Sequence, residues 1–216
     1  MTVAPKLPIV VLLSGSGSNL QAIIDAAGSG RLDVEIRAVI SNKPGAYGLE
    51  RARAAGIATE VVEHTAYDSR EAFDAAMVQV IDRYQPDLVV LAGFMRILTE
   101  GFVNHYAGRL LNIHPSLLPK YQGLNTHQRA IEAGDTKAGA SVHFVGHELD
   151  GGPVIMQAAV AVVKGDTAET LAKRVLAVEH QLYPAAIQLF ASGQIRQQGQ
   201  QVIYQGQPLN QALSLG

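Results

Sequence analysis

The sequence predicts an α/β fold, a single domain with a mostly parallel, twisted sheet and helices on both faces. Fully apolar runs rich in β-branched residues recur along the chain, as at Ile9–Leu13 and Leu88–Ala92, and are typical of strands buried on both faces. Segments with apolar residues at helical spacing separate these runs, most clearly between Ser69 and about Tyr84. Because a helix between two strands carries the chain back to the starting end of the sheet, this alternation favours parallel strands.

Length and composition bound the domain organisation and the class of protein. The 216 residues suit one domain, with a core from about residue 8 to residue 190 and a tail, residues 192–216, that is weakly structured or forms a hairpin. A formal charge of −2 gives no basis for binding nucleic acid. The lack of cysteine excludes disulfides, thiolate metal ligands and a cysteine nucleophile. No apolar run approaches the ~18 residues of a membrane span, and the run near the N-terminus leads into glycines, so we expect a cytoplasmic enzyme.

A glycine-rich loop, Ser14–Asn19, follows the first predicted strand and precedes the helical pattern LQAIIDAA. This order is typical of a phosphate site, because glycines let backbone N–H groups approach an anion and the helix dipole favours it. The alternative is an ordinary tight turn in which Ser18 or Asn19 caps the helix. The third glycine of a dinucleotide fingerprint is missing, and the second strand ends without an acidic residue for a ribose. A phosphate monoester is therefore the better match.

The remaining elements follow from periodicity and from the positions of glycine and proline. We expect strands at Val34–Ile40, Thr59–Val62, Leu111–Ile113, Ala140–Val145 and Val154–Val163, and helices at Gly48–Ala55, at Thr126–Ala133 and after a cap at Asp166 or Thr167. Pro184 should kink or restart the last helix. Ligands of such sheets bind beyond the carboxyl ends of the strands, where Ser14–Asn19, Gly93–Leu98 and Asn112–Tyr121 fall. We expect these three loops to form one site.

The segment LNIHPSLLPKY, Leu111–Tyr121, carries the most chemical information. Asn112 and His114 are two residues apart on a predicted strand and so project from the same face. An amide can donate to an oxygen that gains negative charge, and an imidazole can move a proton. If the fold brings Asp150 to His114, the set is an acyl-transfer site without a covalent nucleophile. The alternative is a packing histidine beside an asparagine that caps backbone groups.

Other polar residues are weaker candidates. His143 and His147 are four residues apart on a predicted strand and loop, where this spacing does not align two metal ligands, so we expect no metal site. Arg70 is poorly placed for the dipole at a helix N-terminus, which favours a binding role. Met95 and Leu98 could pack in the core or wall an aromatic ligand.

Together these motifs resemble the glycinamide ribonucleotide transformylases, the folate-dependent phosphoribosylglycinamide formyltransferases of purine synthesis. The resemblance covers nearly all of the chain up to about Phe190. It is carried by SGSGSNLQAII, SNKPGAYGLERA, DSREAFD, VVLAGFMRIL, LLNIHPSLLPKY, SVHFV, ELDGGPVI and VEHQLYP. NIHPSLLP with a downstream LDGGP is shared more widely among enzymes that use 10-formyltetrahydrofolate, whereas the SNL loop and VEHQLYP point to this family.

The resemblance implies a Rossmann-like formyltransferase fold and direct transfer of a formyl group from the co-substrate 10-formyltetrahydrofolate to the amine of glycinamide ribonucleotide, without a metal. Asn112 would stabilise the oxyanion, His114 would act as general acid or base, and Asp150 would hold the imidazole. The implied ribonucleotide ligands are Gly17, Ser18, Asn19 and Glu179, and the implied folate contacts are Arg70, Met95, Arg96, Ile97, Leu98 and Asn112. The small molecules would be the partners of a monomer or homodimer, with no nucleic acid and no membrane. A cis peptide bond before Pro119 is also implied.

The departures from the family pattern are few. Gln122 and Asn125 stand where relatives often have Pro and His, which could alter the loop over the glycinamide, and Ser16 stands where Asn is frequent. A methionyl-tRNA formyltransferase would need an added RNA-binding domain, which neither the length nor the charge favours. A formyltetrahydrofolate hydrolase would lack the second-substrate loop or carry a regulatory domain. A noncatalytic sensor on the same scaffold would not need Asn112, His114 and Asp150 together.

Overall fold

The computed structural model describes residues 5–215, which divide into two compact units, one up to Leu111 and one from Asn112 onward. The boundary falls inside strand β5 (Leu110–His114), so this strand supplies residues to both units. In each unit, β5 is therefore the end strand of the order.

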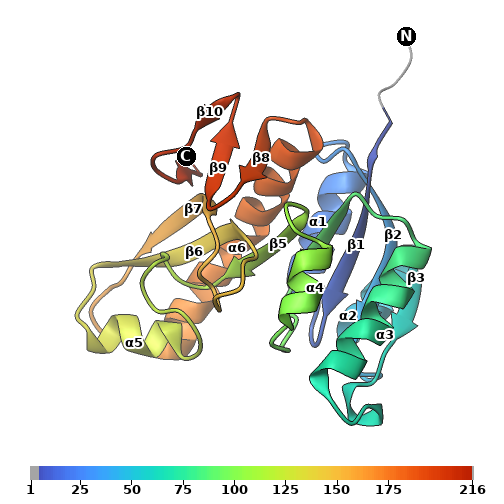
Figure 1. Cartoon of the computed structure of the whole chain (residues 1–216). Helices are drawn as coiled ribbons and strands as arrows, with labels where there is room; N and C mark the ends of the chain where they lie inside the picture. The colour runs from blue at the N-terminus through green and yellow to red at the C-terminus, as the bar shows by residue number, and fades with distance from the viewer. Residues whose placement is uncertain (1–4, 216) are drawn as a thin grey trace. The chain divides into compact units, whose positions relative to one another are not determined.

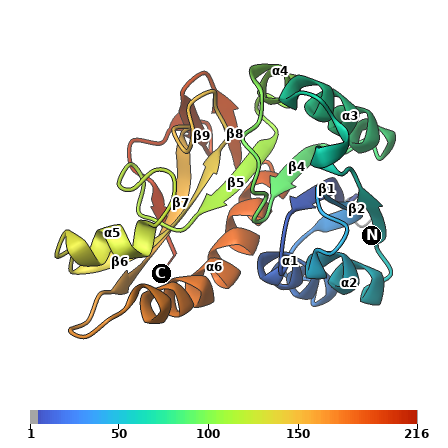
Figure 2. The same cartoon turned by 90° about the horizontal axis from the view of Figure 1, so that it is seen from below.

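The first unit is a parallel sheet covered by helices on both faces. Its elements are β1 (Leu7–Leu13), α1 (Ser18–Gly28), β2 (Val34–Ser41), α2 (Tyr47–Ala54), β3 (Ala58–Val61), the 3₁₀ turn η1 (His64–Ala66), α3 (Arg70–Arg83), β4 (Leu88–Leu91) and α4 (Glu100–His105). The strand order is β5-β4-β1-β2-β3, and β1 pairs in parallel with both β2 and β4. Helices α1 and α2 lie on one face of these strands and α3 on the other (Figure 2). Because both faces are covered, Ile9–Leu13 is fully buried, as its continuous apolar sequence predicts.

The second unit continues from β5 with an antiparallel pair and a long helix. Its elements are α5 (Thr126–Glu132), β6 (Lys137–Phe144), β7 (Val154–Ala161), α6 (Ala168–Ala191), β8 (Ile195–Gln198), β9 (Gln201–Tyr204), β10 (Gln207–Pro208) and β11 (Leu213–Ser214). The strand order is β11-β7-β6-β5, and α6 packs against β6 and β7. β8, β9 and β10 form a separate antiparallel sheet, drawn in red in Figure 1.

Several helix ends follow the predicted capping chemistry. The Ser69 hydroxyl accepts from the Ala72 N–H at 3.1 Å and starts α3. Thr167 caps α6 by a reciprocal bond with Thr170. Asp166, the other candidate, instead pairs with Arg174 at 2.9 Å.

The helices differ from the predicted ones at two points. Of the two alternatives for Pro184, a restart of the last helix is wrong, because α6 runs from Ala168 to Ala191 with Pro184 buried inside it; a kink stays a prediction. The apolar side of α6 packs on two strands over its length, which offsets the one backbone bond that proline removes. The helix α4 is absent from the predicted elements, because six residues are too short for a periodic pattern.

The predicted α/β fold class is confirmed. The parallel strands of the first unit alternate with helices, and the antiparallel pair β6–β7 accounts for the mixed character of the rest. Within residues 5–215, no helix combines the length and the apolar character needed to cross a membrane. The assignment of the whole chain to one domain stays a prediction.

Candidate active site

Strand β5 places Asn112 and His114 two residues apart at its carboxyl end. His114 is buried and Asn112 is half-buried. The chain then turns back in a strap that we define as residues 115–123. This strap contains the Leu118–Pro119 bond, which is cis as expected.

The imidazole of His114 is held between the strap and Asp150. Its Nε2 lies 2.8 Å from the Tyr121 carbonyl oxygen, and because a carbonyl has no hydrogen, Nε2 must donate. Its Nδ1 lies 3.4 Å from Oδ2 of Asp150, and both side chains are more than 90% buried. The fold therefore brings the predicted carboxylate to the predicted imidazole, and a proton carried on Nδ1 would face Asp150.

The Asp150 loop, residues 145–153 between β6 and β7, is shaped by close backbone contacts. Asp150 adopts a left-handed conformation (φ 51°), and its Oδ2 accepts from the Gly123 N–H of the strap at 2.9 Å. A Cβ on Gly152 would lie 1.8 Å from the Phe144 carbonyl oxygen, so only glycine fits there. The second glycine of the LDGGP motif thus lets the loop pack on β6, which fixes the position of Asp150.

Gln122 and Asn125, which depart from the family pattern, both take part in this local structure. The Gln122 side chain donates to the Asp150 carbonyl oxygen at 3.2 Å. Asn125 precedes α5 in a left-handed conformation (φ 56°), which asparagine tolerates better than most residues. Gln122 therefore adds a bond between the strap and the Asp150 loop.

His143 on β6 is a site residue that the sequence reasoning missed. Its Nδ1 lies 2.9 Å from the Phe144 carbonyl oxygen and must donate there, so in the neutral ring Nε2 accepts. Burial lowers the pKa of His143 and favours this neutral form. Nε2 accepts from the Asn112 amide nitrogen at 3.2 Å, which fixes the amide with one N–H left to donate elsewhere. A histidine on an apolar strand was a signal that this side chain needed a polar partner.

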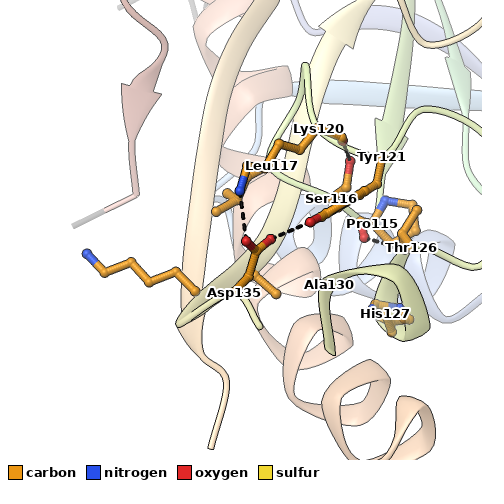
Figure 3. Close-up of a pocket in the computed structure, with 11 residues that line it drawn as sticks. Pro115, Ser116, Leu117, Lys120, Tyr121, Thr126, His127, Ala130 and Asp135 are labelled. Carbon is orange, nitrogen blue, oxygen red and sulfur yellow. Dashed lines mark hydrogen bonds and ion pairs between the residues drawn. The ribbon is translucent and has the colours of Figure 1, made fainter. Parts of the chain in front are cut away.

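His127 lies on α5 and lines a pocket behind the strap (Figure 3). Burial, and second the nearby His114, lower the pKa of His127. Within residues 5–215, no group of three or more His, Cys, Asp or Glu side chains is arranged to hold a metal ion. The ring nitrogens of His143 contact an amide and a carbonyl instead.

The glycine-rich loop of the first unit has the geometry of an anion site. Gly17, not Ser18 or Asn19, occupies the N-cap of α1, in a left-handed conformation (φ 72°) and without a side-chain capping bond. A Cβ on Gly17 would lie 2.5 Å from Cα of Gly48, so the loop packs tightly on the start of α2. As the N-cap residue, Gly17 has no side chain that could compete for the first N–H groups of α1, as an incoming phosphate requires.

Ser14 joins this loop to the segment after β4. Its hydroxyl donates to Oδ1 of Asn42 at 2.6 Å and accepts from the Met95 N–H at 2.8 Å. Met95 and Ile97 are 65% and 58% exposed, so their side chains are not core packing and can meet a ligand. Arg96 stacks on Phe73 with its guanidinium 5.6 Å from the ring centre.

Two other residues expected to bind the substrates, Arg70 and Glu179, lie in different units. Arg70 is exposed at the first turn of α3 in the first unit. Glu179 is buried on α6 in the second unit. The structure brings Asn112, His114 and Asp150 together within the second unit, and brings the glycine loop to the Met95–Leu98 segment within the first. The convergence of all three loops on one site stays a prediction.

Comparisons with known proteins agree with this geometry. Residues 7–187 match the family model described as formyl transferase. The chain is 60% identical over 188 residues to the phosphoribosylglycinamide formyltransferase of Escherichia coli, covering 87% of this chain and 89% of that protein. It is 48% identical over 191 residues, 88% of this chain, to the human trifunctional purine biosynthetic protein adenosine-3, and spans 19% of that protein. The solved phosphoribosylglycinamide formyltransferase of Coxiella burnetii superposes with a TM-score of 0.94 at 52% identity, covering 98% of this chain and 100% of that one.

Proposed function

This chain belongs to the formyl transferase family, and we propose that it transfers a formyl group from 10-formyltetrahydrofolate to the amine of glycinamide ribonucleotide. One observation carries the proposal for the chemistry. Asn112, His114 and Asp150 meet at the end of β5, where an amide, an imidazole and a carboxylate are held by fixed partners. This set suits acyl transfer without a covalent intermediate on the protein.

Asn112 is the proposed oxyanion donor. When the substrate amine attacks the formyl carbon, the formyl oxygen gains negative charge, and a preorganised N–H stabilises that charge most in the transition state. His143 holds one N–H of the amide, which orients the other before the substrate arrives.

His114 and Asp150 are the proposed proton-handling pair. The attacking amine must lose one proton and the leaving N10 of the folate must gain one, so the net charge of the reactants does not change. Nε2 of His114 is engaged by the Tyr121 carbonyl, so the proton for N10 would come from Nδ1, on the side of Asp150. The carboxylate, 3.4 Å from Nδ1, holds the ring in place there.

The binding groups are assigned by their chemistry. The N–H groups of Gly17, Ser18 and Asn19 would hold the ribonucleotide phosphate at the start of α1, and Glu179 would accept from the ribose hydroxyls. Arg70 and the Met95–Leu98 segment would contact the folate.

The glycine-rich loop also distinguishes the proposed function from its alternatives. A methionyl-tRNA formyltransferase or a formyltetrahydrofolate hydrolase would have no use for this phosphate loop. Action in the cytoplasm and a monomeric or dimeric state stay predictions.

The test is a formyl-transfer assay with purified protein, both substrates and no added metal. We expect His114→Ala and Asp150→Asn each to lower kcat, and the double variant to be little worse than His114→Ala alone, because residues that act as a unit are not additive. Fully additive losses would mean that Asp150 acts independently of His114. No transfer to glycinamide ribonucleotide by the unmodified protein would refute the proposed function.

A further inference from the structure

The strap carries a second set of contacts that the proposed mechanism does not use. Tyr121 contributes its carbonyl oxygen to His114, yet its side chain points to the other side of the strap, into the pocket of Figure 3. There its hydroxyl donates to Oδ2 of Asp135 at 2.7 Å. The other oxygen of Asp135 pairs with the Lys120 ammonium at 2.8 Å (Figure 3).

We propose that Tyr121 and Asp135 form a clamp that positions His114: the side-chain bond holds the strap so that the Tyr121 carbonyl fixes the Nε2–H tautomer of the imidazole. Both are positioning residues, because they act through the strap backbone and not on a substrate. The role of the clamp in turnover rests on the proposed formyl transfer, whereas its effect on the imidazole does not.

The backbone of Tyr121 gives the first reason why a clamp is needed. Tyr121 has a φ of 57°, a left-handed conformation that is unfavourable for a residue with a Cβ. Other contacts must hold it there, and the side chain supplies them. The phenol is bonded to Asp135 at its tip, and the Lys120 ammonium and Arg129 guanidinium lie 5.8 and 5.1 Å from the ring centre. If the bond to Asp135 were lost, the Tyr121 side chain would be free to move, and the carbonyl would be held less firmly toward His114.

Asp135 itself is well placed to act as an anchor. It lies in the turn just after α5, and its own N–H donates to the Ala130 carbonyl oxygen at 3.1 Å, which ties it to that helix. The hydrogen bonds from Lys120, and second from Tyr121, hold the pKa of Asp135 below its ordinary value. The carboxylate thus stays ionised at neutral pH, and a charged acceptor makes a stronger bond to the phenol than a neutral one.

The imidazole tautomer is what the clamp would control. With Nε2–H committed to the carbonyl, the Nδ1 position is left to face Asp150, where the mobile proton is needed. If the strap were released, Nε2–H would exchange its fixed acceptor for water, and the ring could rotate or change tautomer. A substitution at Asp135 would then alter His114 without touching it.

The experiment is ¹⁵N NMR of the histidine side chains in the protein without substrates, using Tyr121→Phe and Asp135→Asn. The His114 resonance is assigned as the one lost in His114→Ala. We expect Nε2–H to be protected from solvent exchange in the unmodified protein, and to exchange at least ~10-fold faster in both variants. In the formyl-transfer assay, kcat should fall by about tenfold with little change in KM.

Two matched variants serve as controls. Tyr106→Phe removes the same type of bond, from a buried tyrosine hydroxyl to Asp82 at 2.8 Å, within the other unit. Lys120→Met removes the other partner of Asp135 and keeps the bond from Tyr121. Both should leave the His114 signal unchanged.

An unchanged His114 signal in Tyr121→Phe and Asp135→Asn would overturn the clamp, as would an equal change in Tyr106→Phe. Because the NMR measurement needs no turnover, it decides the clamp even if the proposed formyl transfer fails.

Discussion

At the scale of single residues, the chemistry of this site depends on which atoms carry hydrogens. Carbonyl oxygens can only accept, so the bonds to Tyr121 and Phe144 assign opposite tautomers to His114 and His143. His114 then presents Nδ1 to a carboxylate, and His143 presents a lone pair to an amide. The two histidines lie on neighbouring strands and have different proposed roles: His114 moves a proton, and His143 orients the Asn112 amide.

The first prediction concerns Asn112. If its free N–H stabilises the oxyanion, Asn112→Ala should lower kcat by roughly 10²–10³ with little change in KM, as loss of such a donor typically does. Asn104→Ala, at an exposed position on α4, is the matched control and should keep full activity. Steady-state kinetics would check this, and a change in KM alone would make Asn112 a binding residue.

The second prediction concerns pH and His143. Its pKa is lowered in the folded protein from the ordinary 6.5, because burial disfavours the charged ring. Below about pH 6.5 the unfolded chain therefore binds more protons than the folded one, and stability falls as the pH falls. One proton changes the free energy of unfolding by at most ~1.4 kcal/mol per pH unit.

Urea unfolding between pH 5 and pH 7.5 would measure this slope. His143→Gln, which keeps an acceptor for Asn112, should flatten it but not abolish it, since the lowered pKa of His127 acts in the same direction. The same change at the exposed His147 controls for the loss of an imidazole. An identical slope in His143→Gln would mean that folding does not lower the pKa of His143.

At the scale of elements, the loop before α1 shows how a turn becomes a binding site. Gly17 accepts a left-handed conformation, and its missing Cβ lets the loop pack against Gly48. We predict that Gly17→Ala weakens ribonucleotide binding by roughly tenfold or more and leaves folate binding nearly unchanged, because the displaced N–H groups serve the phosphate alone. Titration of each ligand separately would show the difference. Gly28→Ala, at an open position of α1, should bind both as before, and equal losses for both ligands in Gly17→Ala would make the loop merely structural.

The elements also show what the sequence can and cannot predict. Ile9–Leu13 and Leu88–Leu91 were predictable, because a strand buried on both faces must be apolar throughout. The bond between His143 and Asn112 was not predictable, because it depends on which residues of β6 lie beside β5. The local sequence pattern of one strand does not specify its register against another.

The strap sets a further limit of the same kind. The contact of Asp150 with His114 could be proposed only as a condition on the fold, and the bond of Tyr121 with Asp135 was not foreseen. Both require the chain to turn back over 115–123, where buried, half-buried and exposed residues are mixed without a helical or strand period.

At the scale of the whole molecule, β5 raises a question of cooperativity. Leu110 and Leu111 are buried in the first unit, and Asn112–His114 belong to the second, so neither unit keeps its full set of strands if β5 is lost. A strand common to two compact units should make them unfold together, as expected of small single domains. If the chain is one domain in the thermodynamic sense, its two compact units should unfold in a single transition.

The last prediction tests that cooperativity. Leu111 is fully buried, so Leu111→Ala should lower the free energy of unfolding by about 2–5 kcal/mol. If the chain unfolds as one, hydrogen exchange should show this loss in the amides of β1 and equally in those of β6, although the substitution lies in the first unit. Leu176→Ala, at a 36% exposed position on α6, should change both by far less. Amides that open in the same unfolding event lose the same free energy of opening when a distant residue is replaced. Protection lost in β1 but kept in β6 would therefore show that the two units unfold independently.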